Sequence, residues 1–292
     1  MKKKILVTGS TGYIGRNIIE KLAEEYVIYS PNSYNLNLLD LPKLKFFFEE
    51  NKIDVVIHCA SSGVGRTEEG QSGVFEKNLR MFFNLILCAP LYNKLINFGS
   101  GAEYDKELEI KKIKEEDFGR SIPKMEYDFS KYVMGKYSEK SQENILHLRL
   151  FCVFGKYEDY GKRFISRSIC RNLFRLPIEI NQNAFFDYIY IDDIVEIVNY
   201  FIKNGNREKI YNVGFGQPID LVSLAGIINE IADKKTDIIV KKQGLNKEYS
   251  CDNSKLFNEV RNLSLTSMRR GIKELYEYYK KNIDRIDLEN IK

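Results

Sequence analysis

The feature that most constrains this chain is a set of three glycines at intervals of three residues: Gly9, Gly12 and Gly15. They follow a short apolar segment, residues 4–8, and open a stretch with helical apolar spacing, residues 12–24. Such a strand-to-helix turn lets the backbone approach a pyrophosphate, which then meets unpaired N–H groups and the positive end of the helix dipole. The sequence therefore predicts a dinucleotide-binding turn at its start.

Strand-like and helix-like segments alternate through the first half of the chain. Continuous apolar strands separated by helices indicate βαβ units and a parallel sheet that is covered on both faces. We therefore predict an α/β fold with a doubly wound parallel sheet of the Rossmann type. The expected strands are residues 4–8, 27–29, 54–60, 94–99 and 145–153, and the expected helices are 12–24, 42–51, 74–88 and 127–139.

The pattern changes after about residue 155. A basic helix is expected at residues 156–175, one more strand and helix at 187–201, and a polar, helix-rich tail towards the end. We expect residues 1–155 to form an NAD(P)-binding Rossmann domain, completed by roughly 187–213. Residues 156–186 and 214–292 would form a smaller mixed α/β domain that binds the substrate. Catalytic clefts commonly lie at such boundaries.

Composition excludes several functional classes. The 45 lysines and arginines balance 41 acidic residues, and the charges are mixed along the chain, so no nucleic-acid partner is expected. No apolar run approaches the roughly 20 residues that span a bilayer, so we expect a cytoplasmic protein without a membrane partner. His58 and His147 are the only histidines and lie in strand-like runs, and the five cysteines form no Cys-x-x-Cys pair. Neither a metal site nor a Ser-His-Asp hydrolase is expected.

The glycine spacing resembles that of the short-chain dehydrogenase/reductase superfamily, and the chain is similar to its extended branch, the NAD-dependent epimerase/dehydratase family. This branch works mainly on nucleotide sugars. Nearly the whole chain shares the resemblance. The matching segments are residues 8–15, 54–60, 78 with 84–86, 149–155, 187–195 and 211–214. The resemblance implies a nicotinamide cofactor, with the end of the strand 54–60 behind it.

Reduction of a ketone needs a proton for its oxygen, and a Tyr four residues before a Lys places both on one helix face. The ammonium group favours the phenolate form of the Tyr and lowers its pKa. Two pairs fit, Tyr127 with Lys131 and Tyr132 with Lys136, but their five-residue offset is about 140° around a helix. The Tyr-x-x-Ser-Lys pattern of the family favours Tyr127 as acid/base and Lys131 as its partner. The resemblance also implies a carbonyl-holding hydroxyl at Ser100.

Departures from the family pattern narrow the chemistry. The 4,6-dehydratases of the branch carry an Asp-Glu pair directly after the catalytic Ser or Thr, whereas this chain has Gly101 and Ala102. Glu103 is one residue further, and a strand-like register would point it elsewhere. Residues 36–40 resemble the adenine-binding stretch of GDP-fucose synthase. The epimerising Cys of that enzyme is Ala102 here, and no histidine lies near Arg163, so epimerisation by that route is disfavoured.

The choice of cofactor depends on the segment after the second strand. NAD enzymes commonly hold the ribose 2′-OH there with an acidic residue. Residues 29–33 contain no carboxylate and no arginine, which favours NADP(H), with NAD(H) as the alternative. The residues expected to bind the cofactor are Gly9, Ser10, Thr11, Gly12, Tyr13, Ile14, Gly15, Ser30, Asn37, Leu38, Ala60, Ser61, Asn78, Tyr127 and Lys131.

The residues expected to bind the substrate depart from the family pattern. Many members of the family have an Arg that contacts the nucleotide immediately before the Asp of the strand at 187–191, and this chain has Phe186 there. A substrate pyrophosphate would then need other cations, for which Lys162, Arg163, Arg167 and Arg171 are the candidates.

The sequence favours an NADPH-dependent reductase that acts at C4 of a nucleotide-linked 4-keto-6-deoxy sugar for surface-polysaccharide synthesis. A nucleotide-sugar 4-epimerase with tightly bound NAD is the alternative, and a non-catalytic NAD(P)-binding protein is a third hypothesis. The family resemblance also implies a homodimer formed through the helices at 74–88 and near 127. Phe75, Leu79, Phe82, Phe83 and Ile86 would supply the apolar surface, although an internal core could use them equally.

Overall fold

The computed structural model describes residues 2–63, 73–261 and 263–292. A six-stranded sheet with the order β11-β6-β4-β3-β1-β2 forms its centre, and every neighbouring pair of strands is parallel. The predicted α/β class with a doubly wound parallel sheet is confirmed. The strands are β1 (Lys4–Thr8), β2 (Val27–Tyr29), β3 (Val55–His58), β4 (Lys94–Ser100), β6 (Ile145–Leu150) and β11 (Ile210–Val213).

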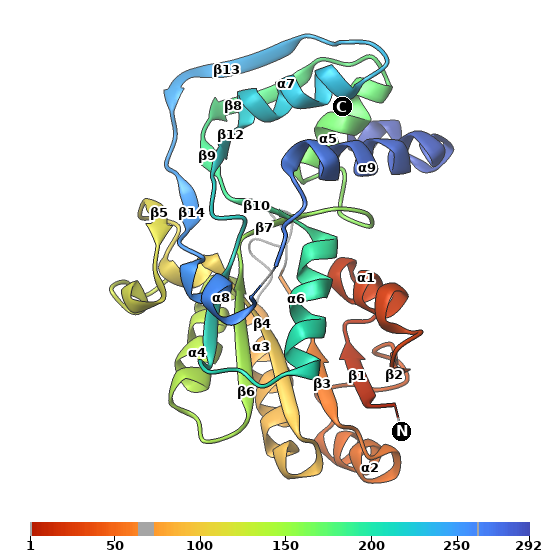
Figure 1. Cartoon of the computed structure of the whole chain (residues 1–292), viewed down its shortest axis with the longest axis vertical. Helices are drawn as coiled ribbons and strands as arrows, with labels where there is room; N and C mark the ends of the chain where they lie inside the picture. The colour runs from red at the N-terminus through yellow and green to blue at the C-terminus, as the bar shows by residue number, and fades with distance from the viewer. Residues whose placement is uncertain (1, 64–72, 262) are drawn as a thin grey trace.

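Helices cover both faces of the sheet, as the unbroken apolar strands require. Ile5 and Val7 of β1 point into a cluster shared with α1 and α6, whereas Leu6 between them points into a second cluster shared with α2, α3 and α4. The helices lie beside the strands in Figure 1. Their bounds are α1 (Tyr13–Leu22), α2 (Leu41–Asn51), α3 (Val74–Leu87), α4 (Glu126–Lys140) and α6 (Ile191–Lys203).

Most of the remaining elements form a second lobe beyond the carboxyl ends of the central strands, in the upper half of Figure 1. Two short sheets, β10-β7 and β12-β9-β14-β5, lie next to the central sheet, and a parallel ribbon of β8 and β13 lies further out with three helices. The strands are β5 (Ile110–Ile113), β7 (Cys152–Phe154), β8 (Ile178–Asn183), β9 (Phe185–Phe186), β10 (Tyr188–Tyr190), β12 (Ile219–Asp220), β13 (Ile238–Leu245) and β14 (Tyr249–Cys251). The three helices are α5 (Phe164–Leu173), α7 (Leu221–Ile231) and α9 (Met268–Lys281), whereas α8 (Ser254–Glu259) lies lower, against β11 of the central sheet.

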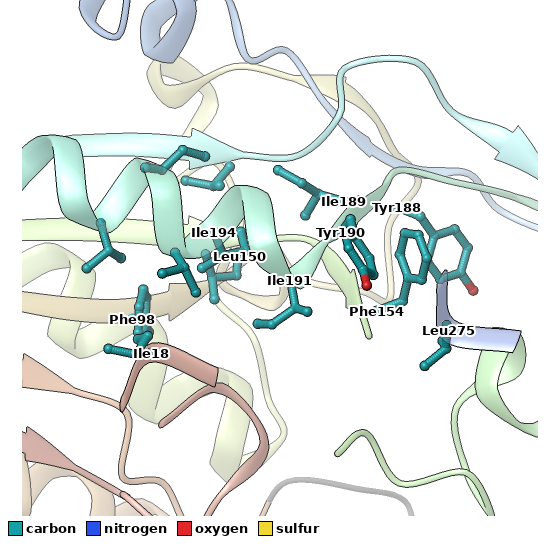
Figure 2. Packing of buried hydrophobic residues seen from close by; sticks show 14 of the residues in the cluster. Ile18, Phe98, Leu150, Phe154, Tyr188, Ile189, Tyr190, Ile191, Ile194 and Leu275 are labelled. Carbon is teal, nitrogen blue, oxygen red and sulfur yellow. The ribbon is translucent and has the colours of Figure 1, made fainter. Parts of the chain in front are cut away.

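One apolar core runs from the sheet into this lobe. Figure 2 shows Phe98 and Leu150 of the central sheet close to Ile194 of α6, with Phe154 and Leu275 at the other end of the same cluster. Burial of a large aliphatic or aromatic side chain contributes about 1.5–3 kcal/mol, so this shared core holds the lobe against the sheet. The domain division expected from the sequence remains a proposal.

Some element predictions were wrong in detail. The basic helix expected at residues 156–175 begins only at Phe164, because the chain first turns through Gly155 and Tyr157, which has a left-handed φ of 71°. The strand expected at 145–153 is interrupted at Phe151, and β7 pairs with β10 instead of continuing in the central sheet. β13 lies in the tail that was expected to be helical. It is largely exposed, so it lacks the apolar pattern that would have identified it.

Candidate active site

The glycine turn lies between the carboxyl ends of β1 and β3, where the chain order of the sheet reverses. Gly9 has a φ of 64°, and a Cβ at this position would lie 2.6 Å from the backbone nitrogen of Ala60. The N–H of Gly12 donates to the carbonyl of Gly9 at 3.0 Å, and a side chain on Gly15 would collide with that same carbonyl. Only glycines allow β1, α1 and the end of β3 to approach this closely. Ligands of open α/β sheets bind at such reversal points.

Several polar groups around the turn fit a phosphate-containing cofactor. Gly12 is the N-cap residue of α1, and no side chain caps the N–H groups of the first turn. Within the described part of the chain, the hydroxyls of Ser61 and Tyr13 are buried without a hydrogen-bond partner. Unpaired donors at a helix N-terminus favour an anion, and buried orphan hydroxyls in native proteins call for a partner. The residues at this turn therefore fit the dinucleotide that the sequence predicted.

The residues predicted for the adenosine side lie along the loop between β2 and α2. Ser30 is exposed at the end of β2. Asn37 is exposed and its side-chain oxygen accepts a backbone N–H two residues later at 3.0 Å, whereas Leu38 is buried and its carbonyl accepts from the Asn84 amide at 2.7 Å. The side chain of Ser10 is buried and donates to the carbonyl of Pro31 at 3.1 Å. These contacts connect the loop to the glycine turn.

Asn78 joins the loop after β3 to α4. Its amide oxygen accepts the N–H of Ser62 at 2.8 Å, while its nitrogen donates to the carbonyl of Ser62 at 3.0 Å and to the hydroxyl of Ser130 at 3.2 Å. The side chain was predicted to bind the cofactor. In the structure its amide holds Ser62, directly after Ser61, against the helix that carries Tyr127 and Lys131, and the cofactor contact stays a prediction.

Ser100, Tyr127 and Lys131 meet at the carboxyl end of β4. Tyr127 lies in the first turn of α4, and the Lys131 Nζ is 5.8 Å from the centre of its ring. Lys131 is buried and donates to the carbonyl of Phe98 at 2.8 Å. Burial raises the pKa of Tyr127 to about 12, opposed in part by Arg163 and by a hydrogen bond from Ser100. Burial lowers the pKa of Lys131 to about 8.

The alternative pair occupies another part of α4. Lys136 donates to the carbonyl of Phe118 at 3.4 Å, and its Nζ lies 4.2 Å from the centre of that ring. Tyr132 packs against Phe118 with ring centres 5.1 Å apart. This pair is therefore directed at Phe118, a buried ring of the cluster that also contains Tyr104 and Phe151.

Glu103 is fully buried under the site and points away from it. Its carboxylate accepts the backbone N–H of Ser100 at 2.9 Å, the His147 Nε2 at 2.9 Å and the Arg149 Nε at 2.6 Å. Burial would raise the pKa of Glu103, but His147 and Arg149 outweigh it and hold that pKa at about 2. The sequence did not reveal this network. The only signal was that His147 and Arg149 lie two residues apart in β6 and hence on one face.

The four candidate cations of the substrate side differ in their surroundings. Arg163 directly precedes α5. Its positive charge partly offsets the rise that burial causes in the pKa of Tyr127 and of Cys152. Arg171, which was predicted to bind a substrate pyrophosphate, is only 5% exposed. Its guanidinium donates to the carbonyls of residues 177 and 291 at 2.6 Å and to Glu179 at 2.9 Å, and its role towards a substrate stays a prediction. Arg167 likewise donates to the carbonyl of Lys292 at 3.1 Å.

Aromatic residues line the second-lobe side of the site. Phe186 packs near Tyr188 and Tyr249, with ring centres 6.0 and 6.3 Å apart. Tyr249 itself packs on Phe151 with ring centres 5.0 Å apart in a tilted arrangement, and a Cβ on Gly101 would lie 2.5 Å from its hydroxyl. Tyr249 was not among the predicted site residues, because it stands 122 positions after Tyr127 in a polar stretch without a motif.

The described ranges contain neither a helix that could span a membrane nor a cluster that could hold a metal ion. Each helix there is too short or too polar to span a lipid bilayer. No group of three or more His, Cys, Asp or Glu side chains is placed to hold a metal ion in that part of the chain.

Comparisons with known proteins agree with this geometry. The model of the NAD dependent epimerase/dehydratase family matches residues 5–214. The chain is 26% identical over 262 residues to the ADP-L-glycero-D-manno-heptose-6-epimerase of Brachyspira hyodysenteriae, which covers 78% of this chain and 80% of the relative. It is 22% identical over 302 residues to the GDP-L-colitose synthase of Yersinia pseudotuberculosis, covering 94% and 97%.

A solved structure shares the fold over nearly the whole length. The GDP-mannoheptose C4 reductase of Campylobacter jejuni, with NADP bound, superposes with a TM-score of 0.81 at 21% sequence identity. The match covers 96% of this chain and 98% of that one. At this identity the likeness shows the fold alone.

Proposed function

The chain belongs to the NAD dependent epimerase/dehydratase family, and we propose that it is an NADPH-dependent reductase of the C4 ketone in a nucleotide-linked 4-keto-6-deoxy sugar. The observation that carries the proposal is the meeting of Ser100, Tyr127 and Lys131 beside the end of the glycine turn. The product would be a 4-hydroxy sugar for surface-polysaccharide synthesis.

Each residue has a role that follows from its surroundings. A bound nicotinamide supplies the hydride. The glycine turn and the uncapped N-terminus of α1 bind the pyrophosphate. The Ser100 hydroxyl holds the keto oxygen, and Tyr127 gives that oxygen a proton as negative charge develops on it.

The electrostatics of the pair suit proton donation. Because the pKa of Tyr127 is raised to about 12, the phenol is protonated at neutral pH and can act as an acid. Lys131 has a pKa of about 8, so at pH 7 most of it carries a positive charge next to the tyrosine. That charge favours the phenolate left after proton transfer and so lowers the barrier to donation.

The residues after Ser100 argue against elimination of water. Gly101 and Ala102 carry no titratable group, and the carboxylate of Glu103 is already bound by His147 and Arg149. A dehydratase needs an acid and a base at the sugar, and neither stands at these positions. These residues therefore favour hydride transfer at a single carbon over elimination.

We propose NADPH as the preferred reductant and NADH as the weaker one. Ser30 directly follows β2 as an exposed residue, and the next residues up to Ser33 bring no carboxylate. An acidic side chain here would repel a 2′-phosphate, so its absence permits one. Measured Michaelis constants for both reductants would decide, and a lower kcat/KM with NADPH than with NADH would refute this preference.

The test is a panel of nucleotide-linked 4-keto-6-deoxy sugars with the purified protein. We expect one NADPH consumed per sugar reduced, with the hydrogen at C4 derived from the cofactor. Tyr127→Phe serves as the inactive control. A protein that consumes no NADPH with any member of the panel would refute the reductase proposal.

A 4-epimerase with tightly bound NAD is the second candidate. It is favoured by the same Ser-Tyr-Lys arrangement and by the epimerase among the relatives. An epimerase retains its cofactor through purification and turns over without added NADPH. Cofactor content after denaturation, measured together with turnover in the absence of NADPH, separates the two functions.

We also propose a homodimer formed through α3 and α4. These helices pack on each other through aromatic pairs, with Phe75 and Phe129 stacked at 4.9 Å and Phe83 against Tyr137 at 5.1 Å. The pairs make the two helices one rigid unit that could face a second copy. Light scattering on the purified protein would give the mass of the assembly, and a monomer at micromolar concentration would refute the dimer.

A further inference from the structure

A buried carboxylate lies directly behind Ser100. Glu103 is completely buried, and its Oε1 accepts the backbone N–H of Ser100 at 2.9 Å. The same oxygen is 2.9 Å from the His147 Nε2, while the Oε2 accepts from the Arg149 Nε at 2.6 Å. The carboxylate therefore holds the main chain of Ser100 and is itself held by two side chains of β6.

The backbone around this carboxylate leaves no room for further atoms. A Cβ on Gly99 would overlap both the His147 Nε2 and the Glu103 Oε1. A Cβ on Gly135 would lie 2.5 Å from the Glu103 Oε2. The two glycines thus allow the end of β4 and one face of α4 to approach the two oxygens of the same carboxylate.

The face of α4 that meets the carboxylate is the face that carries the site. Tyr127, Lys131 and Gly135 follow one another at intervals of four residues, so they lie on one side of the helix. Lys131 donates to the carbonyl of Phe98 at 2.8 Å, and one turn later Gly135 adjoins Glu103. The helix therefore contacts the end of β4 at two points, once through the lysine and once through the buried carboxylate.

The hydrogen-bond partners of His147 determine its protonation state. An ionised carboxylate only accepts, so the Nε2 that faces Glu103 must carry a proton. The Nδ1 lies 2.9 Å from the side-chain nitrogen of Asn97, which can only donate. The Nδ1 must then be the acceptor, and the ring is neutral. Arg149 therefore supplies the positive charge that balances the carboxylate.

We propose that Glu103 is a positioning residue, which fixes the main chain of Ser100 so that the serine hydroxyl stays in reach of the substrate oxygen that Tyr127 protonates. His147 and Arg149 act on the serine through this carboxylate. The effect on turnover rests on the proposed reductase function. The hydrogen bonds of Glu103 and the protonation of His147 do not, so the two parts can be tested separately.

The kinetic test is a double-mutant cycle with His147→Phe and Ser100→Ala. The phenylalanine keeps a ring in β6 but removes one hydrogen bond from the Glu103 oxygen that holds the serine. We expect His147→Phe to lower kcat about tenfold, as for the loss of one hydrogen bond, with an unchanged Kd for NADPH. In the Ser100→Ala background the same substitution should not lower kcat further, because no serine hydroxyl is left to be positioned.

Tyr104→Phe is the matched control, because it removes buried hydrogen bonds from the same network. The Tyr104 hydroxyl accepts from the Arg149 Nη1 at 3.2 Å and donates to the Asn212 Oδ1 at 2.8 Å. Its loss leaves the bonds from Ser100, His147 and the Arg149 Nε to the carboxylate in place. We expect a lower Tm, as for His147→Phe, but an unchanged kcat.

Three kinetic outcomes would overturn the role in catalysis. An unchanged kcat in His147→Phe would mean that Ser100 needs no such support. Equal losses of kcat in His147→Phe and Tyr104→Phe would mean that the network only stabilises the fold. Multiplicative losses in the cycle would mean that His147 affects the reaction by a route other than Ser100.

Nuclear magnetic resonance of the wild-type protein tests the hydrogen bonds without any substrate. The chain has only two histidines, so nitrogen-15 labelling of histidine gives two sets of ring signals, and a His58→Gln sample assigns them. We expect a neutral His147 at pH 7, with its proton on Nε2. A proton on Nδ1, alone or with one on Nε2, would overturn the inference. A wild-type enzyme that reduces no keto sugar, with His147 neutral as expected, would refute the reductase function and leave the hydrogen bonds of Glu103 standing.

Discussion

Replacing Gly9 by alanine is a sharp test of the glycine turn, because the structure allows its cost to be divided into two parts. The residue has a φ of 64°, which costs an alanine about 1 kcal/mol in the left-handed region. The new Cβ would also lie 2.6–2.8 Å from backbone atoms of Cys59 and Ala60. Backbone atoms cannot rotate away, so we add about 1–3 kcal/mol for this overlap.

The total of roughly 2–4 kcal/mol corresponds to a fall in Tm of about 3–7 °C for a chain of this size. The shift that relieves the overlap also moves the N–H groups at the start of α1. Since a hydrogen bond to a charged group contributes about 1.5–3 kcal/mol, we expect the Kd for the cofactor to rise about 10- to 100-fold. Calorimetric titration with NADPH and thermal unfolding measure the two effects on the same samples.

Gly244→Ala is the matched control. Gly244 has a φ of 77°, but a Cβ there would meet nothing within 4 Å. In Gly244→Ala the free energy of unfolding should fall only by the cost of an alanine in the left-handed region, and the affinity for NADPH should be unchanged. If Gly9→Ala and Gly244→Ala fall equally in Tm, or if Gly9→Ala binds NADPH as the wild type does, the close approach of β1, α1 and β3 is not what the turn requires.

Three further outcomes are expected. Tyr127→Phe should lose nearly all turnover yet bind NADPH normally, while Tyr132→Phe keeps its turnover; the reverse result would place the acid in the other pair. Because the pKa of Lys131 is lowered to about 8, its charge is present below that pH, and kcat should fall as the pH rises through about 8; a flat profile from pH 7 to 9 would show that the charge is not needed. Glu103→Gln should cost about 3–5 kcal/mol in the free energy of unfolding, since it leaves Arg149 buried without its carboxylate, and a urea titration that finds less than about 1 kcal/mol would contradict this. The folded-state pKa of Glu103 is about 2, below its ordinary value of 4.5, so the stabilisation by the wild-type carboxylate is complete above about pH 4.5 and is lost as the pH falls towards 2.

Local patterns explain what could be predicted. The strands β1, β3 and β4 are apolar on both faces, and the glycine turn lies between a strand and a helix, so the parallel sheet and its binding turn could be located from short windows of sequence. Tyr127, Lys131 and Ser100 were predicted from a spacing within one helix, the Tyr-x-x-Ser-Lys pattern of the family and the end of a strand, and their catalytic role stays a prediction. These signals depend on neighbours in the sequence, which a single chain displays.

The features that were missed depend on contacts between distant segments. The Tyr249 hydroxyl comes to lie beside Gly101 only because β14 pairs with β5 and β9, and no periodicity marks a pairing across more than a hundred residues. Arg171 looked like a surface cation on a basic helix, but the carbonyl of Ile291 takes its guanidinium at 2.6 Å. Charge alone does not tell a ligand-binding arginine from one that anchors the chain.

The sheet order also determines how this protein must fold as it is made. β6 ends at Leu150, but β11, which covers its outer edge, ends only at Val213, about 60 residues later. At a synthesis rate of about 5–20 residues per second, the nascent chain presents an unpaired β6 edge for roughly 3–12 s. The edge of β5 that pairs with β14 stays unpaired still longer, because β14 is synthesised much later. Ribosome-associated chaperones would therefore bind this chain while one edge of its central sheet is still unpaired. A messenger RNA truncated between the codons for β6 and β11 would yield a protein that is prone to edge-to-edge aggregation.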